Sequence, residues 1–326
     1  MHEQNSETGP RPTLRIIRPS SREQTDLLPE RIVELRKLGF RILHDELAQD
    51  PSWAYSAASI PHRTEALTSA LTERSSTAIV CARGGYGASD LLPHLPWDKL
   101  RTASRDGKLT PKLLVGFSDI SALHSALWRQ LGWVGLHAPM PATSLWRKDG
   151  ENKDIEALLE CLSGAKFGGD IPVKRVPDGG KNAPEGKQPR IEGRLFGGCF
   201  SVLTNLIGTP YLPPDLGGYI LFFEDIGEHP GRLMRFLNQW LQAGMLRGVR
   251  AVVLGSLTQL APAIPDNADF VYAEFAKRLE CPVFCTSAFG HVSPNFPIGV
   301  GVEAWVAGDT LSWKFRTGKN PESTNT

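Results

Sequence analysis

A serine follows a short apolar strand at the point where a helix is expected to begin. Residues 113–115 read as a buried strand, Gly116 opens a turn, and a helical pattern runs over about residues 120–131. Such a serine lies at the carboxyl edge of a parallel sheet, where open α/β folds place their active sites. The turn resembles a nucleophile elbow, although the pattern Gly-X-Ser-X-Gly is absent. Ser118 is therefore a candidate nucleophile, and helix capping by Ser118 or Asp119 is the alternative.

A glycine-rich segment follows a second apolar strand. Residues 78–82 read as a buried strand, and residues 83–87 are Arg-Gly-Gly-Tyr-Gly. Three glycines within four positions allow the backbone to turn tightly and a substrate to approach closely. The N–H of Gly85 could form one half of an oxyanion hole, with the N–H of Asp119 as the other half. The alternatives are a simple turn and a phosphate cradle, but the Walker spacing and Gly-X-Gly-X-X-Gly are both absent.

Two acidic residues, Glu224 and Asp225, follow a strongly apolar strand at residues 219–223. A carboxylate beside a core needs a partner, because an unpaired buried ion is strongly destabilising. Glu224 could orient a histidine and stabilise its protonated form, as the acid of a Ser-His-acid triad does. The alternative is an ordinary ion pair with Arg232 or Arg235.

His291 lies in a loop flanked by Gly290 and Pro294, after an apolar strand. A base in such a loop can reach across a cleft to a nucleophile on another element. The chain has eight histidines, so an ordinary hydrogen-bonding histidine is the alternative. No His-X3-His or similar spacing supports a metal site. We expect no metal and no organic cofactor.

Strands alternate with helices in the elements that position these residues, which predicts an α/β fold with a parallel sheet covered on both faces. The predicted strands are residues 14–17, 40–43, 78–82, 113–115, 219–223, 252–254 and 283–284. The predicted helices are residues 28–38, 63–73, 120–131, 200–207 and 231–243.

The composition changes between residues 166 and 190, which are rich in Gly, Pro and Lys. Such a stretch is typical of a linker or a long surface excursion. We therefore predict an N-terminal α/β domain over residues 1–165, which carries the candidate nucleophile. The linker over 166–190 leads to a second, smaller mixed α/β domain over 191–326, which carries the candidate acid and base.

The overall composition is that of an ordinary globular protein, with 41% hydrophobic and 22% charged residues and a formal net charge of +1. Without a basic cluster interleaved with aromatic residues, nothing indicates a nucleic-acid partner. The longest apolar runs, such as 219–223, are too short to cross a bilayer. The polar N-terminus lacks the apolar segment of a signal peptide. We expect no membrane association and a cytoplasmic location.

Five cysteines are present without Cys-X-X-Cys spacing: Cys81, Cys161, Cys199, Cys281 and Cys285. Cys281 and Cys285 could pair, but free thiols are expected in a chain without an export signal. Cys81 could be the nucleophile of a cysteine amidotransferase, although its place inside a strand favours burial.

Together these segments resemble the signature blocks of the LD-carboxypeptidase family of serine peptidases. The blocks are Ala-Arg-Gly-Gly-Tyr-Gly at 82–87, Gly-Phe-Ser-Asp at 116–119, Phe-Phe-Glu-Asp-Ile-Gly-Glu at 222–228 and Gly-His-Val-Ser-Pro at 290–294. Their order also matches the family, and the similarity spans roughly residues 14–305. The chain departs from the usual pattern at Cys199, where asparagine is common, and at Ala138, where glycine is common.

The resemblance implies that Ser118 is the nucleophile, His291 the general base and Glu224 the acid that orients it. It implies a first domain similar to that of glutamine amidotransferases and a site in the interdomain cleft. The implied substrate is a muropeptide tetrapeptide, cleaved at its L,D bond to release terminal D-alanine during peptidoglycan recycling. The family also tends to form homodimers.

A substrate with a free terminal carboxylate needs a cationic group in the site. Arg83 is the candidate, with Tyr86 close to it in sequence, and an internal ion pair is the alternative for Arg83.

Two other functions stay open. Microcin C immunity peptidases resemble this family and cleave an aminoacyl nucleotide, for which Trp146 or Trp53 could provide an aromatic platform. A non-catalytic binding module that keeps only the scaffold is the second alternative, but the intact set of Ser118, Glu224 and His291 argues against it.

Overall fold

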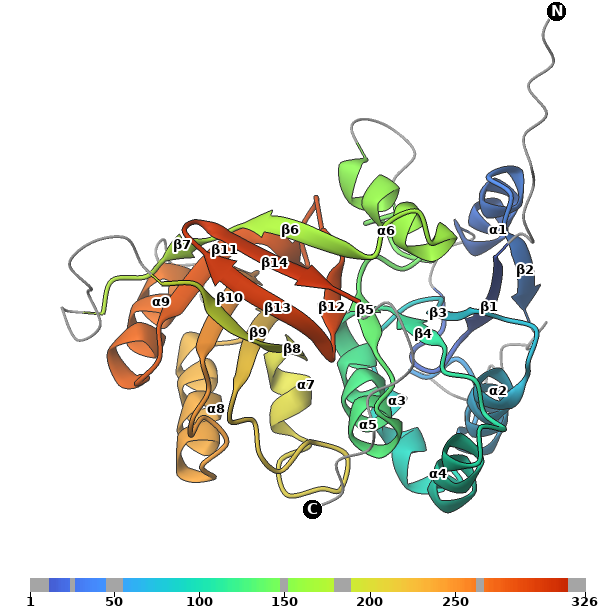
Figure 1. The fold of residues 1–326 in the computed structure, drawn as a ribbon, viewed down its shortest axis with the longest axis horizontal. Helices are drawn as coiled ribbons and strands as arrows, with labels where there is room; N and C mark the ends of the chain where they lie inside the picture. The colour runs from blue at the N-terminus through green and yellow to red at the C-terminus, as the bar shows by residue number, and fades with distance from the viewer. Residues whose placement is uncertain are drawn as a thin grey trace, which may run out of the picture.

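The computed structural model describes residues 12–23, 27–44, 55–146, 152–178, 189–261 and 267–315. In this part of the chain the strands form a six-stranded sheet and an eight-stranded sheet, with helices packed around them (Figure 1). The predicted fold class, a parallel-sheet α/β domain followed by a mixed α/β domain, is confirmed.

The first sheet has the strand order β12-β5-β4-β3-β1-β2, and β1 to β5 are parallel. Its strands are apolar on both faces because helices cover both sides. These strands are β1 (Thr13–Ile17), β2 (Arg41–His44), β3 (Ala78–Cys81), β4 (Leu113–Val115) and β5 (Gly135–His137). The helices are α1 (Leu27–Lys37), α2 (Ile60–Thr72), α3 (Ala88–Leu91), η1 (Leu92–His94), α4 (Trp97–Arg105), η2 (Ser118–Ile120), α5 (Ser121–Leu131) and α6 (Lys153–Ser163).

The order of the parallel strands, 2-1-3-4-5, reverses direction between β1 and β3. In open α/β sheets, ligands bind outside the carboxyl ends of the strands near such a reversal. Because the strands are parallel, the segments that follow β1, β3 and β4 all leave the sheet at this edge. They carry Ser20, the glycine-rich loop and Ser118.

The second sheet is mixed, with parallel strands β8 to β11 at its centre. Its strands are β6 (Gly168–Pro172), β7 (Lys174–Arg175), β8 (Ile191–Cys199), β9 (Tyr219–Ile226), β10 (Ala251–Thr258), β11 (Val283–Gly290), β13 (Val302–Ala307) and β14 (Thr310–Lys314). Its helices are α7 (Phe200–Thr204), α8 (Pro230–Gln242) and α9 (Asn267–Arg278). Among the described residues, no helix combines the length and the apolar character that crossing a bilayer requires.

Part of the predicted linker, residues 166–190, is structured. Residues 168–172 form β6 against β14, and residues 174–175 form β7 against β11, at opposite edges of the second sheet. Edge strands of this kind are held mainly by backbone hydrogen bonds, which any sequence can form. The sequence of β6, Gly-Gly-Asp-Ile-Pro, therefore lacks the apolar pattern by which a strand is predicted. Residues 179–188 lie outside the described residues, and the domain limits stay a prediction.

The two domains are joined by a strand and by a close contact. The short strand β12 (Ile298–Val300) follows β11 but pairs antiparallel with β5 of the first sheet, and Figure 1 shows both between the two domains. At the start of α5, Ser121 Oγ accepts the N–H of Cys199 at 2.9 Å. Gly198 permits this approach, because a Cβ there would lie 2.3 Å from Ser121 Oγ. The carboxyl edges of the two sheets therefore meet.

Candidate active site

Ser118, His291 and Glu224 form one continuous chain of hydrogen bonds. Ser118 Oγ lies 3.0 Å from Nε2 of His291. Nδ1 of the same ring lies 2.7 Å from Oε2 of Glu224. The structure therefore brings together three side chains that are far apart in the sequence, one from the first domain and two from the second.

Ser118 has a left-handed backbone conformation, with φ at 63°. This conformation is unfavourable for a residue with a Cβ, and it recurs where a nucleophile must stand out from a strand-to-helix turn. The N-cap residues of η2 and α5 are Phe117 and Ile120, and neither helix has a side-chain cap bond, so the alternative of helix capping by Ser118 or Asp119 is not found. Behind the turn, the buried ring of His124 contacts the carbonyl of Gly116 through Nε2 at 2.9 Å.

Glu224 lies inside β9, which runs to Ile226 instead of ending at residue 223 as expected, and its side chain is fully buried. Burial alone would raise the pKa of this carboxyl, but the charge and hydrogen bond of His291 outweigh it and lower the pKa. The carboxyl is therefore ionised at neutral pH. Arg232, one alternative partner, pairs instead with Glu228 at 3.3 Å.

His291 begins the loop after β11, and its side chain is 14% exposed. Burial would lower the pKa of the imidazole, but the carboxylates of Glu224 and Asp225 raise it overall. The ring of Phe117 lies against it, with 4.8 Å between ring centroids. The imidazole is thus oriented by a carboxylate on one side and an aromatic ring on another.

Two buried hydrogen bonds in succession hold the loop that carries His291. The N–H of Gly290 donates to Oδ1 of Asn295 at 3.1 Å, and the N–H of Asn295 donates to Oδ2 of Asp154 at 2.8 Å. Asp154 lies in the first turn of α6. Sequence reasoning missed both Asn295 and Asp154, because their role depends on a contact between segments 141 positions apart.

Gly84 packs directly against the nucleophile. A Cβ on Gly84 would lie 3.1 Å from the Cβ of Ser118 and 3.4 Å from the backbone nitrogen of Asp119. Gly85 has φ at 111° and lies against Ser21. Only glycine allows this loop to approach the serine so closely.

The side chain of Asp119 braces the glycine-rich loop. Its Oδ2 accepts the hydroxyl of Ser20 at 2.6 Å and the N–H of Ala88 at 2.8 Å. The buried guanidinium of Arg63 adds bonds to the carbonyls of Pro19 and Gly87, both at 2.6 Å. The sequence prediction gave Asp119 a backbone role and missed this structural one.

Arg83 and Tyr86, the candidate substrate-binding residues, lie in the same loop. Arg83 donates to the carbonyls of Arg22 at 2.9 Å and Gly84 at 3.2 Å. No carboxylate among the described residues pairs with it, so the predicted alternative of an internal ion pair is not found there. Tyr86 is 57% exposed, and its hydroxyl bonds to Asp90 at 3.4 Å.

The structure argues against two alternative site residues. Cys81 is fully buried in β3, and burial strongly raises its pKa, so its thiolate is not available as a nucleophile. Trp146 is 2% exposed and belongs to the core, so it cannot stack on a ligand. Trp53 lies outside the described residues. Cys281 and Cys285 are unpaired.

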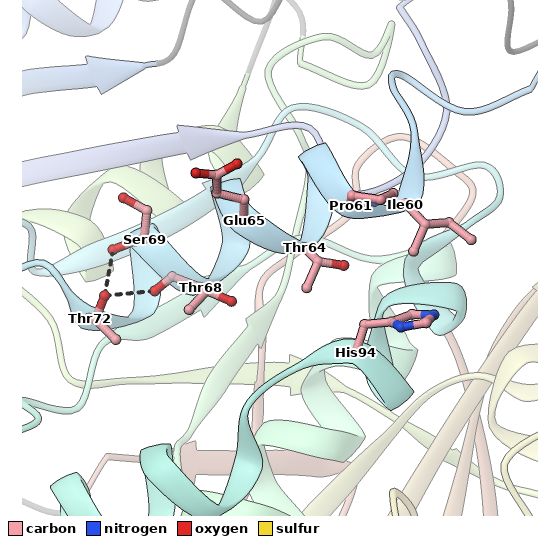
Figure 2. A pocket seen from close by; sticks show the side chains of 8 residues that line it. All are labelled: Ile60, Pro61, Thr64, Glu65, Thr68, Ser69, Thr72 and His94. Carbon is pink, nitrogen blue, oxygen red and sulfur yellow. Dashed lines mark hydrogen bonds between the residues drawn. The ribbon is translucent and has the colours of Figure 1, made fainter.

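A surface hollow of about 760 Å³ lies elsewhere, along α2 (Figure 2). Its lining is made of small hydroxyl and apolar side chains together with Glu65 and His94. None of its residues belongs to the hydrogen-bonded chain or to the glycine-rich loop. Within the described part of the protein, no group of His, Cys, Asp and Glu side chains is arranged to hold a metal ion.

A serine hydroxyl bonded to an imidazole, with a buried carboxylate behind the ring and backbone amides nearby, is the arrangement that activates serine in hydrolases. Together with the α/β fold, it defines the class of serine-type hydrolases. The sequence narrows the class further. Residues 14–138 match the LD-carboxypeptidase N-terminal domain, and residues 192–306 match the LD-carboxypeptidase C-terminal domain. The chain belongs to the LD-carboxypeptidase family and is a serine-type carboxypeptidase.

Individual relatives agree with this assignment. The chain is 32% identical to the murein tetrapeptide carboxypeptidase of Pseudomonas aeruginosa over 305 residues, which cover 91% of this chain and 94% of that protein. The muramoyltetrapeptide carboxypeptidase of Oxalobacter formigenes has a similar structure, with a TM-score of 0.77, 27% identity, and coverage of 94% of this chain and 100% of that one. An MccF-like protein from Bacillus anthracis also has a TM-score of 0.77, with coverage of 95% and 98%. At 22% identity, this last similarity shows the fold alone.

Proposed function

We propose that this protein removes terminal D-alanine from muropeptide tetrapeptides, with Ser118 as nucleophile, His291 as general base and Glu224 as the orienting acid. The observation that carries the proposal is the continuous chain of hydrogen bonds from Ser118 Oγ to the buried Glu224. The similarity to the murein tetrapeptide carboxypeptidase of Pseudomonas aeruginosa supports the substrate.

In the proposed reaction, Ser118 Oγ attacks the carbonyl carbon of the L,D peptide bond while Nε2 of His291 takes the hydroxyl proton. The C–N bond then breaks, and His291 returns the proton to the leaving amine of D-alanine. Water, deprotonated by His291, hydrolyses the acyl ester and regenerates the serine. Throughout, Glu224 stabilises the imidazolium that forms in each step.

The N–H groups of Gly85 and Asp119 are the proposed oxyanion hole. The carbonyl of Gly84 accepts the N–H of Ser21 at 3.4 Å. Because N–H and C=O point in opposite directions across a trans peptide, the N–H of Gly85 points away from Ser21. A Cβ added to Gly84 would lie 3.4 Å from the backbone nitrogen of Asp119, and this close approach of the loop supports a shared role for the two amides.

Arg83 is the proposed ligand of the substrate's terminal carboxylate, with Tyr86 at the edge of the same loop. A guanidinium without a carboxylate partner among the described residues is suited to an anionic ligand. The proposed enzyme needs no cofactor or nucleic-acid or membrane partner, and acts as a homodimer. We place it in the cytoplasm, because five unpaired cysteines are typical of a reducing compartment.

The test is D-alanine release from a purified murein tetrapeptide. We expect Ser118→Ala to lose on the order of a thousandfold or more in kcat, while Ser163→Ala, at an exposed position on α6, stays at the wild-type rate. An aminoacyl sulfamoyl adenosine serves as the competing substrate. Wild-type protein that cleaves this nucleotide but not the tetrapeptide would contradict the proposed substrate.

A further inference from the structure

A second histidine lies directly behind the hydrogen-bonded chain. His137 ends β5 and is fully buried. The rings of Phe117, Phe222 and Phe289 lie edge-on to its imidazole, with ring centroids 5.6, 5.5 and 6.1 Å away. Three aromatic rings therefore surround the imidazole, and one carboxylate lies beside it.

That carboxylate is Glu224, and it presents the oxygen that His291 does not use. Nε2 of His137 lies 4.0 Å from Oε1 of Glu224, whereas His291 bonds to Oε2. Among the described residues, neither Oε1 nor either nitrogen of His137 has a hydrogen-bond partner. Buried polar atoms without partners are rare and costly, so two such groups facing each other indicate an interaction between them.

The titratable groups that face His137 are Glu224 from β9, His291 from the β11 loop and His124 from α5. Burial lowers the pKa of His137 to about 4; Glu224 raises it in part, and the two other histidines lower it. The ring is therefore neutral at neutral pH and carries one N–H. A neutral His137 ring can direct an N–H dipole at Glu224. Because it carries no charge, it does not compete with protonated His291 for the carboxylate.

We propose that His137 is a positioning residue for Glu224: in its Nε2–H tautomer it directs an N–H at Oε1 and thereby keeps Oε2 turned toward His291. The inference rests on the proposed roles of the triad residues. The separation of 4.0 Å is longer than a hydrogen bond, so the interaction is that of a dipole with an ion. Such an interaction is weakly screened in apolar surroundings.

Without this N–H, nothing among the described contacts distinguishes the two carboxylate oxygens except His291 itself. The carboxylate could then turn about its last bond and lengthen the contact to Nδ1 of His291. A misplacement of about 1 Å in such a chain can cost on the order of a hundredfold in rate. Substrate binding would be unaffected, because His137 is fully buried.

The variants compared are His137→Leu, which removes the N–H, and His137→Gln, which can return one near the position of Nε2. Phe289→Leu is the packing control, because it removes a ring beside His137 without changing a polar atom. We expect His137→Leu to lose on the order of a hundredfold in kcat with KM within about twofold of wild type. His137→Gln should recover at least about tenfold of that loss, and Phe289→Leu should stay near wild type. In His137→Leu the acid limb of the pH profile should also move to lower pH, because the longer contact weakens the effect by which Glu224 raises the pKa of His291.

Equal losses in the Leu and Gln variants, or a loss in Phe289→Leu as large as in His137→Leu, would overturn the inference. If the Leu variant does not fold, ¹⁵N NMR of the wild-type imidazoles decides, with His137 assigned by the signals absent from His137→Gln. The inference requires a neutral ring protonated on Nε2 from about pH 5 to pH 9, and a proton on Nδ1 contradicts it. This measurement does not depend on turnover, so failure of the proposed activity and failure of the inference are distinguishable.

Discussion

The backbone of Ser118 has a strained left-handed conformation, which the packing of its neighbours stabilises. A left-handed φ of 63° costs a residue with a Cβ on the order of 1–2 kcal/mol. Gly84 on one side and Gly116 on the other leave no Cβ to push the turn back, and the serine hydroxyl stays within 3.0 Å of His291. The strain is therefore balanced by packing and serves to hold the oxygen at the edge of the sheet.

The raised pKa of His291 makes a prediction about pH. The base acts in its neutral form, so the rate should fall as the pH falls through a pKa that lies above the usual value of about 6.5. Glu224→Gln removes the charge that raises this pKa. We expect its acid limb to move to lower pH and its kcat to fall on the order of ten-thousandfold. The measurement is kcat/KM for D-alanine release as a function of pH. An acid limb that does not move in Glu224→Gln would show that another group titrates.

Individual residues differ in how far the sequence revealed them. Ser118 and His291 follow the ends of strands and Glu224 lies near the end of one, and their motifs identified them together although each alone was ambiguous. Asn295 and His137 have no such motif in a single sequence, because their significance comes from atoms that only the folded chain brings near. Gly84 was hidden for a related reason: all three glycines of the loop look alike until one touches the serine.

The glycine-rich loop makes a prediction of its own. In Gly84→Ala, the new Cβ would lie 3.1 Å from the Cβ of Ser118 and 3.2 Å from the carbonyl oxygen of Phe117. Because one of these neighbours is backbone, the loop or the nucleophile must shift, and we expect kcat to fall on the order of a hundredfold. Gly217→Ala is the matched control, since its nearest neighbour is the end of the Asp215 side chain. Steady-state kinetics and thermal unfolding of both variants test this. Full activity in Gly84→Ala would mean that the loop does not set the position of the serine.

Several elements were predicted to within a few residues, as α8 illustrates: residues 231–243 were expected and Pro230–Gln242 is observed. Strands β5, β6, β7, β8, β12, β13 and β14 were not predicted. Each of them has an antiparallel partner, and that partner can lie far along the chain, as with β12 and β5. Backbone pairing with a distant strand decides such elements, and the local sequence carries little trace of it.

Across the whole molecule, two buried histidines link stability to acidity. Burial lowers the pKa values of His124 and His137 to about 4. The unfolded state therefore binds more protons than the folded state between about pH 6.5 and pH 4, and stability falls as the pH falls through this window. Each histidine contributes on the order of 3 kcal/mol to that loss. Asp225, whose pKa is raised to about 6 by burial and Glu224, and Asp119, whose pKa is also raised by burial, oppose part of this loss.

Urea unfolding from about pH 7 to pH 4 measures this dependence. We expect a steady loss of unfolding free energy, and a smaller slope in His124→Gln, which removes one of the two titrating rings. A stability that stays flat over this range, or an unchanged slope in the variant, would contradict the prediction.

The pairing of β12 with β5 also matters while the chain is being made. Strand β5 is complete at residue 137, but the strand that covers its outer side arrives only at residues 298–300. While residues 138–297 are being added, the emerging first domain therefore presents an uncovered row of backbone N–H and C=O groups to other nascent chains. The ribosome must add most of the second domain before β12 can pair with β5. The last part of the chain therefore protects the first domain from pairing with other chains.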